Sequence, residues 1–199
     1  MTVATRDKIY VGIDPGQTGA FAVIYPGGSV ESCHAPFKIV RKKLPRSKTK
    51  AGKPRFKTVA ANYDFRRMYL LFYRLRLLQR DRGCEVIVGI ERQCARPTDA
   101  KGVVFAVGRN QMVWEAMAGA NKFLPKMVSP SVWKPLYLGK GASKERSRQL
   151  CLQLYPTVSL PLKKDEARAE AILIADYLLR LDRVLTFPRQ SSLRGGASR

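Results

Sequence analysis

Two short apolar segments, residues 8–14 and 85–91, constrain the fold of this chain more than any other feature. The first alternates apolar side chains with others at a period of two, which is typical of a strand. The second contains the run Val-Ile-Val-Gly-Ile, and such a run is typical of a central strand covered on both faces. The segments end in Asp14 and Glu91. We therefore expect neighbouring central strands that carry carboxylates at their ends.

The surrounding segments predict an α/β fold with a mixed central sheet flanked by helices. Apolar residues recur at spacings of three and four over residues 64–82, which predicts a helix with Asp64 as its N-cap and Gly83 at its end. We expect one domain over residues 1–187 and a basic, disordered tail at 188–199. The remaining predicted elements are strands at 20–25, 30–35 and 126–128 and helices at 101–120, 129–138, 143–155 and 165–181.

The charge of the chain predicts a polyanionic partner. Lys and Arg number 37 against 15 Asp and Glu, so the formal net charge is +22. Nucleic acid is the first candidate, and an anionic membrane surface is the weaker one. Ten basic residues and no acidic one lie in residues 38–57, where Pro45, Gly52 and Pro54 argue against a helix. We interpret this insert as a mobile basic arm or long loop that binds nucleic acid, with a merely solvated loop as the alternative.

Several classes of protein and of site are disfavoured. No apolar run approaches the about 20 residues of a membrane span, and residues 1–8 lack an apolar signal segment. We expect an intracellular, nucleic-acid-associated protein, in the cytoplasm or nucleoid if the source is bacterial or viral. His34 is the only histidine, which argues against histidine-dependent triads and a structural zinc site. The four dispersed cysteines are expected to be free, mostly buried thiols.

Carboxylates form the constellation that could carry chemistry. Asp14 and Glu91 end strands, and Asp165, Glu166 and Glu170 open an apolar helix. Buried carboxylates need partners, and two hard divalent cations, roughly 3.5–4 Å apart, would satisfy several while catalysing in-line phosphoryl displacement. The alternatives are structural: Asp14 as a turn cap, Glu91 paired with an arginine, and Glu166 with Glu170 on a solvated helix face. Asp165 and Glu170 lie roughly 140° apart on an ideal helix, so Glu166 is a rival for the fourth position.

Four segments in order resemble the RuvC-type Holliday junction resolvases of the RNase H-like superfamily. Residues 13–19 with their Asp-Pro-Gly sequence resemble the first-strand motif, and residues 88–93 the second acidic strand, with Arg92 as a departure. Residues 132–134 and 138–144 resemble the loop and helix that contact junction phosphates. Residues 163–175 are most similar to the plant organellar branch. The bacterial form spaces its last two acids by three, and Ala167 occupies that position here, so the organellar pattern favours Asp165.

The resemblance implies a homodimeric endonuclease that cuts opposed strands of a four-way junction symmetrically with two Mg²⁺ or Mn²⁺ ions per active site, and with no nucleotide cofactor or membrane. It implies that the catalytic, metal-binding residues are Asp14, Glu91, Asp165 and Glu170. DNA contacts are expected from the basic insert and from other basic residues, namely Lys42, Lys43, Arg46, Arg96, Lys134, Lys140, Lys144, Lys163 and Lys164.

Two further features follow from the resemblance. Helix 101–120, with Gly108, Trp114 and Ala118, is similar to the family's dimer helix, although ordinary core packing explains these residues equally well. The loop that wedges into a junction in the family corresponds to residues 94–101, which start without an aromatic residue, so Arg96 and Pro97 are the candidates.

Three other functions compete with a resolvase. Residues 12–19 also resemble the phosphate loop of actin-like and sugar-kinase ATPases, but those need two such domains and a much longer chain than 199 residues. A non-catalytic protein that binds branched DNA or RNA would use the acids only structurally. A related nuclease of the same fold would cut RNA–DNA hybrids or transposon ends.

Overall fold

Residues 8–14 and 85–91 form neighbouring central strands, as their apolar patterns predicted. The computed structural model describes residues 7–16, 18–48, 54–139 and 144–186. In it, β1 (Lys8–Asp14) pairs in parallel with β6 (Glu85–Glu91), with Ile13 opposite Ile90. Because parallel strands run in the same direction, both acidic ends lie at one edge of the sheet.

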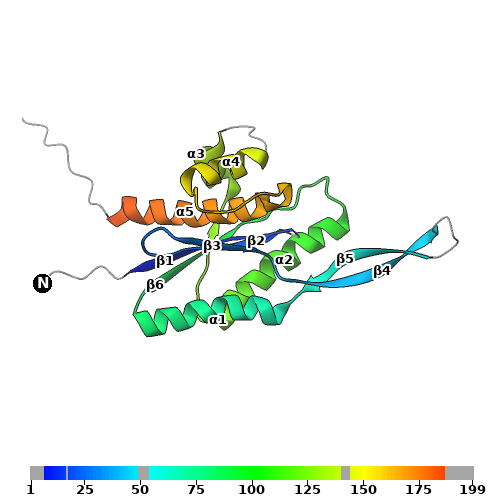
Figure 1. Cartoon of the computed structure of the whole chain (residues 1–199), viewed down its shortest axis with the longest axis horizontal. Helices are drawn as coiled ribbons and strands as arrows, with labels where there is room; N and C mark the ends of the chain where they lie inside the picture. Colours follow the sequence, from blue (N-terminus) through cyan, green and yellow to red (C-terminus); the bar gives the residue numbers. More distant parts are fainter. Residues whose placement is uncertain (1–6, 17, 49–53, 140–143, 187–199) are drawn as a thin grey trace, which may run out of the picture.

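The other strands complete a mixed five-stranded sheet in the order β3-β2-β1-β6-β7 (Figure 1). Strands β2 (Ala20–Ile24) and β3 (Val30–His34) extend it by antiparallel hairpins, and β7 (Lys126–Val128) pairs in parallel with β6. The α/β fold expected from the sequence, a mixed central sheet flanked by helices, is confirmed.

Helices cover both faces of the sheet (Figure 1). Helices α1 (Phe65–Arg82) and α2 (Lys101–Ala120) lie on one face, over a core that includes Phe72 and Trp114. Helices α3 (Pro130–Leu138), α4 (Lys144–Leu154) and α5 (Glu166–Thr186) lie on the other face, over Trp133 and the apolar middle of α5. Successive side chains of β1 point to opposite faces of the sheet. Ile9, Val11 and Ile13 therefore pack in the first core, and Tyr10 packs in the second.

Gly12 allows α5 to lie directly on β1. A Cβ atom at this position would overlap the carbonyl oxygen of Ala171 and lie 2.5 Å from the Ala175 amide nitrogen. The missing side chain therefore brings the start of α5, with its acidic residues, close to the end of β1.

The basic insert is a strand pair, so its interpretation as a long loop is wrong. Strands β4 (Phe37–Lys48) and β5 (Pro54–Tyr63) form a separate antiparallel ribbon, which projects from the body of the protein (Figure 1). The described residues of the insert, 38–48 and 54–57, are strands rather than a helix. Mutual pairing satisfies the backbone groups that each segment turns toward the other, and register shifts between Lys43 and Lys48 accommodate the irregular stretch that contains Pro45.

Other predicted features lie close to their expected positions. Asp64 caps α1 by accepting from the Arg67 N–H (3.2 Å), and Gly83 ends the helix with a left-handed conformation. The last helix begins at Glu166, after a short 3-10 turn η1 (Lys163–Asp165), and it extends to Thr186 rather than residue 181. All four cysteines are free, and Cys94 is exposed. The tail at 188–199, Ser143 and Lys140 lie outside the described residues.

No helix in the described part of the chain combines the length and apolarity needed to cross a bilayer.

Candidate active site

Asp14 lies at the end of β1, where its side chain also stabilises the following turn. Its Oδ1 atom accepts a hydrogen bond from the Gly16 N–H (2.9 Å), and the Gly19 N–H donates to the Gly16 carbonyl (2.8 Å). The turn-cap role considered from the sequence is therefore real. It engages one carboxylate oxygen with a backbone donor, which leaves the charge of Asp14 at the sheet edge.

Glu91 is buried at the end of β6, with 5% of its surface exposed. The Trp133 indole N–H donates to its Oε1 atom (3.1 Å), and the Lys134 Nζ lies 3.2 Å from the same oxygen. The pKa of Glu91 is raised to about 6, mainly by burial; the Lys134 ammonium opposes this rise, and the charges of Asp14 and Glu170 add to it. The partner of Glu91 is thus a lysine rather than the arginine considered from the sequence.

Lys134 connects Glu91 with Glu170. Its Nζ donates to Glu170 Oε2 (3.1 Å), while the Ser147 hydroxyl is 3.4 Å from Glu170 Oε1 and donates to it. The ammonium also lies 5.3 Å from the ring centre of Trp133. Lys134 was expected to contact DNA phosphates, but in this structure its charge is paired with two carboxylates inside the site.

Asp165 is directed away from this cluster. Only 2% of its surface is exposed. Its Oδ1 lies 3.0 Å from His34 Nε2 and 3.3 Å from Arg168 Nη1. Its Oδ2 accepts a hydrogen bond from the Leu162 N–H (2.9 Å). Although burial alone would raise the pKa of Asp165, these three partners hold it below its usual value. Both oxygens therefore tie the start of α5 to β3 and to the preceding segment.

Glu166, and not Asp165, lies beside two of the other predicted carboxylates. It lines a pocket of 170 Å³ together with Asp14 and Glu170. Glu166 and Glu170 are four residues apart in α5 and so share a helix face, as their spacing predicted. Asp165 diverges because it belongs to the 3-10 turn before the helix, where the backbone follows a different rotation.

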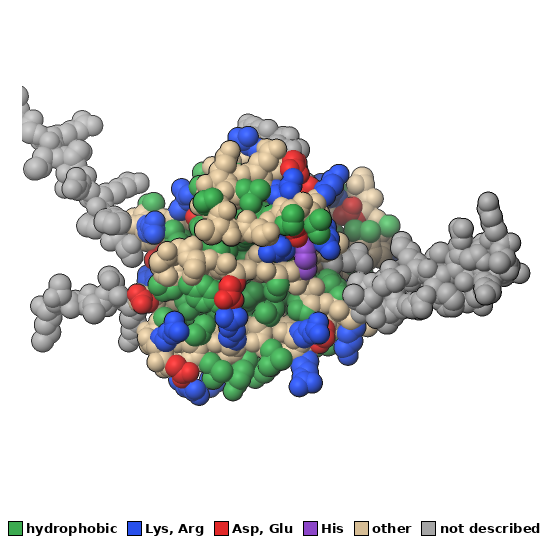
Figure 2. All heavy atoms as spheres, in the orientation of Figure 1, with side chains coloured by type: hydrophobic (Ala, Val, Ile, Leu, Met, Phe, Trp, Pro, Cys, Tyr) green, Lys and Arg blue, Asp and Glu red, His purple; other side chains and the backbone are tan. Residues whose placement is uncertain are grey.

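Apart from Lys134, described above, and Lys140, which lies outside the described residues, the predicted DNA-contact residues fall into three groups. Lys163 and Lys164 are exposed and line the same pocket, next to the acidic side chains. Arg96 is exposed in the loop after β6, where its backbone N–H donates to Asp99 (2.7 Å). For the rest, the backbone of Lys42, Lys43, Arg46 and Lys144 is placed but their side chains lie outside the described set. On the visible face, basic side chains are spread among other residues rather than gathered in one patch (Figure 2).

The carboxylates do not form a ready metal centre in this conformation. Among the described residues, no three His, Cys, Asp or Glu side chains stand together in a way that could hold one ion. The Lys134 ammonium lies between two of the predicted ligands, Glu91 and Glu170. The cluster nevertheless consists of oxygen donors alone, which is the donor chemistry that Mg²⁺ and Mn²⁺ prefer.

Helix α2 presents a different face from the one expected for dimerisation. Trp114 and Ala118 are fully buried in the core of their own chain, and Gly108 is exposed. The sequence could not distinguish core packing from a dimer contact, and the structure assigns Trp114 and Ala118 to the core. A different set of α2 residues is apolar and exposed, namely Val103, Val104, Phe105 and Met112.

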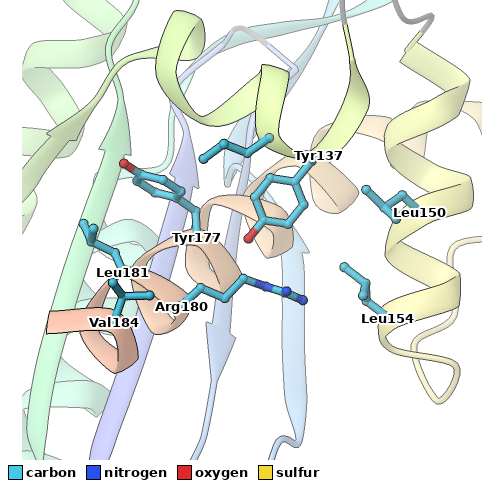
Figure 3. A pocket seen from close by; sticks show the side chains of 8 residues that line it. Tyr137, Leu150, Leu154, Tyr177, Arg180, Leu181 and Val184 are labelled. Carbon is cyan, nitrogen blue, oxygen red and sulfur yellow. The ribbon is translucent and has the colours of Figure 1, made fainter. Parts of the chain in front are cut away.

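A larger pocket of 480 Å³ lies elsewhere, among α3, α4 and α5 (Figure 3). Of its eight lining residues only Arg180 is charged, and Arg180 pairs with the buried Asp176 (2.6 Å). Asp176 also accepts from the hydroxyls of Tyr137 and Tyr155 (2.6 Å each). With its charges already paired, this groove is an apolar surface without groups suited to phosphate chemistry.

Sequence reasoning missed two features of the cluster. The roles of Trp133 and Ser147 as hydrogen-bond donors to the carboxylates became visible only in the folded chain. Trp133 did stand in the motif at 132–134, but its hydrogen bond to Glu91 spans 42 positions of sequence.

The buried state of Glu91 predicts a specific pH dependence of stability. Its pKa is raised from 4.5 to about 6 in the folded protein, so the folded state holds this proton more tightly than the unfolded state does. The stability that Glu91 contributes is full below about pH 4.5 and is lost as the pH rises through about 6. We expect the unfolding free energy of the protein, relative to that of Glu91→Gln, to fall by about 2 kcal/mol between about pH 4 and about pH 7.5. Urea titrations in EDTA would measure this, and a pH-independent difference would contradict it.

No family model matches the sequence, and no curated protein matches it. Thermus thermophilus RuvC is similar in structure, at 17% identity and a TM-score of 0.48, covering 87% of this chain and 96% of that one. The structure of T. thermophilus RuvC in complex with a Holliday junction substrate is also similar, at 14% identity and a TM-score of 0.47. It likewise covers 87% of this chain and 96% of that one.

A third similar structure is the yeast mitochondrial Holliday junction resolvase Ydc2, at 19% identity and a TM-score of 0.40, covering 91% of this chain and 80% of that one. Two of the three structures are of RuvC. The closer similarity to the plant organellar branch stays a prediction.

Proposed function

We propose that this protein is a structure-selective DNA endonuclease that resolves four-way junctions by symmetric phosphodiester hydrolysis. The observation that carries the proposal is the gathering of scarce carboxylates in a strongly basic chain. Asp14, Glu166 and Glu170 line one pocket, and buried Glu91 joins them through Lys134. Only 15 acidic residues stand against 37 basic ones, so this local excess of negative charge has a specific use.

The cluster suits divalent cations in its chemistry. We propose that Asp14, Glu91, Glu166 and Glu170 hold Mg²⁺ or Mn²⁺, with Glu166 in place of Asp165 because both oxygens of Asp165 are engaged elsewhere. Bound ions would supply activation of the attacking water and stabilisation of the leaving oxygen. The ammonium of Lys134 already contacts two of these carboxylates, which supports a site that accommodates positive charge.

The chain's own residues have separate tasks in this proposal. Lys163 and Lys164, at the pocket, attract the phosphate that is to be cut. Trp133 and Ser147 fix the orientation of Glu91 and Glu170 by donating hydrogen bonds. Asp165 is a positioning residue, because its contacts with His34 and Arg168 set where α5 begins.

Symmetric cutting requires two active sites, so we propose a homodimer. A two-fold assembly matches the pairing of opposed strands in a four-way junction. The exposed apolar residues of α2 (Val103, Val104, Phe105 and Met112) supply a surface that a second copy would cover.

A non-catalytic protein that binds branched nucleic acid is the second candidate. It is favoured by the pairing of Lys134 with both Glu91 and Glu170, which offsets part of their negative charge without any ion. A nuclease of this fold that cuts RNA–DNA hybrids or transposon ends would use the same cluster on another substrate.

One experiment separates these functions. The protein is incubated with a synthetic four-way junction, a linear duplex, a transposon-end duplex and an RNA–DNA hybrid, each with Mg²⁺, Mn²⁺ or EDTA. We expect paired nicks in opposed strands of the junction alone, and only with a divalent ion. Binding to the junction without cleavage under any condition would support the non-catalytic function, and cleavage of the hybrid or transposon end would support the third candidate.

A further inference from the structure

The β4–β5 ribbon is the largest feature that the candidate active site does not use. Its strands pair with each other in a sheet separate from the central one, and they project from the body (Figure 1). The region 38–57 within it holds ten basic residues and no acidic one. A two-stranded ribbon of this width fits the major groove of duplex DNA, and its composition matches a phosphate backbone.

The root of the ribbon is fixed rather than hinged. Phe37 and Tyr63, which pair across its first rung, stack with ring centres 4.5 Å apart. Tyr63 is buried, and the backbone continues from it with the Asp64 N–H donating to the Pro36 carbonyl (2.8 Å). Both strands therefore leave the body from one rigid, packed point.

The same root contacts the turn that follows Asp14. The Tyr63 hydroxyl donates to the Pro15 carbonyl (3.1 Å) and lies 3.4 Å from the Gly16 carbonyl. The Gly16 N–H in turn donates to Asp14 Oδ1 (2.9 Å). The direction of the ribbon is thereby set relative to the carboxylate at the end of β1.

We propose that the ribbon binds one duplex arm of the DNA at a distance from the cut site, and that its fixed root places this arm in register with the active-site pocket. The inference rests on the proposed function and deepens it, because it names the part of the substrate that lies outside the junction centre. The 12 residues of β4 extend over roughly 35 Å, which corresponds to about ten base pairs of duplex. Duplex arms much shorter than this cannot follow the whole ribbon.

The test removes charge from the ribbon while keeping its backbone. The variant Lys42→Gln/Lys43→Gln/Lys57→Gln alters positions at or next to the Lys42–Lys57 rung. The matched control Arg82→Gln/Lys122→Gln/Lys126→Gln removes the same charge from exposed positions of the body. Affinity is measured in EDTA, by fluorescence anisotropy, for junctions with arms of about 25 and of about 8 base pairs across a series of salt concentrations.

For the long-armed junction, we expect the ribbon variant to bind at least about tenfold more weakly and to show a salt slope shallower by up to about 3, since each neutralised phosphate contributes about 0.9. For the short-armed junction it should bind nearly as the unaltered protein does, and the control variant should differ little from that protein on both. Equal losses on long and short arms, equal losses in both variants, or an unchanged salt slope would overturn the inference.

The outcome is separable from the proposed function. Binding in EDTA needs no cleavage, so an arm-dependent ribbon effect in a protein that never nicks DNA would support this inference and remove the resolvase. Junction-specific nicking with an unaffected ribbon variant would do the opposite. Circular dichroism of each variant verifies that the fold is retained.

Discussion

Replacing Asp14 by Asn is expected to abolish junction cleavage while leaving junction binding intact. Asparagine retains the size of the side chain and an oxygen that can accept from the Gly16 N–H, so the turn after β1 is preserved. It removes the negative charge that, with Glu166 and Glu170, lines the pocket. Substituting groups that only support metal ligands typically costs 10–100-fold, so loss of a ligand itself should lower the single-turnover cleavage rate by at least about 100-fold.

The measurement pairs cleavage in Mg²⁺ with binding in EDTA. Affinity for the junction should stay within about twofold, because the positive charge of the chain is unchanged. Asp81→Asn is the matched control: its carboxylate is exposed and pairs only with the neighbouring Arg80 among the contacts described, so both cleavage and binding should be unaffected. Full activity of the Asp14 variant would remove this residue from the site, and a loss of binding would assign it a structural role.

The same assay distinguishes Glu166 from Asp165. Glu166→Gln should lose cleavage with little change in unfolding free energy, because Glu166 lines the pocket. Asp165→Asn should instead lower the unfolding free energy by about 1–3 kcal/mol, because His34 and Arg168 lose their charged partner. The reverse pattern would restore Asp165 as the fourth carboxylate, as the organellar resemblance implies.

The second large effect is expected from Gly12→Ala. The added methyl group would collide with the backbone of α5 at Ala171 and Ala175, and backbone atoms cannot turn aside as a flexible side chain can. Overpacking of a core typically costs 1–3 kcal/mol and can cost more, so we expect a loss of at least about 3 kcal/mol in unfolding free energy. The end of β1 would also move away from the start of α5, so cleavage should fall even where the protein remains folded.

Gly108→Ala is the control for this substitution. Gly108 is exposed in α2 with no heavy atom within 4 Å of an added Cβ, so alanine should stabilise the helix by about 0.5–1 kcal/mol. Denaturant titration of both variants gives the comparison. Equal stability of the two would show that α5 does not rest on Gly12 as tightly as the structure indicates.

The sequence determined the central sheet and its acidic ends because these features are local. Alternation in residues 8–14 and the continuous run in residues 85–91 report which side chains are buried, and burial of a strand is a property of its own residues. The caps of α1 are equally local, since Asp64 acts three residues from its donor. The positions of Asp14 and Glu91 at one sheet edge followed directly from these elements.

The ribbon shows where local patterns fail. Both segments contain apolar residues, but groups of basic residues and Pro45 interrupt them, so no continuous alternation predicts strands. What makes them strands is pairing between two segments whose paired residues are up to about 26 positions apart, such as Phe37 with Tyr63. Composition predicted the absence of a helix but not the partner that each backbone would find.

Tertiary structure alone decided the arrangement of charges in the site. Lys134 and Glu170 are 36 positions apart, and His34 and Asp165 are 131 apart, yet each pair is in contact. No spacing rule links such distant residues, because their proximity depends on how α5 packs on β1 and β3. The sequence thus supplied the acidic residues, and the packing of α5 decided that Glu166 lines the pocket while Asp165 anchors the helix.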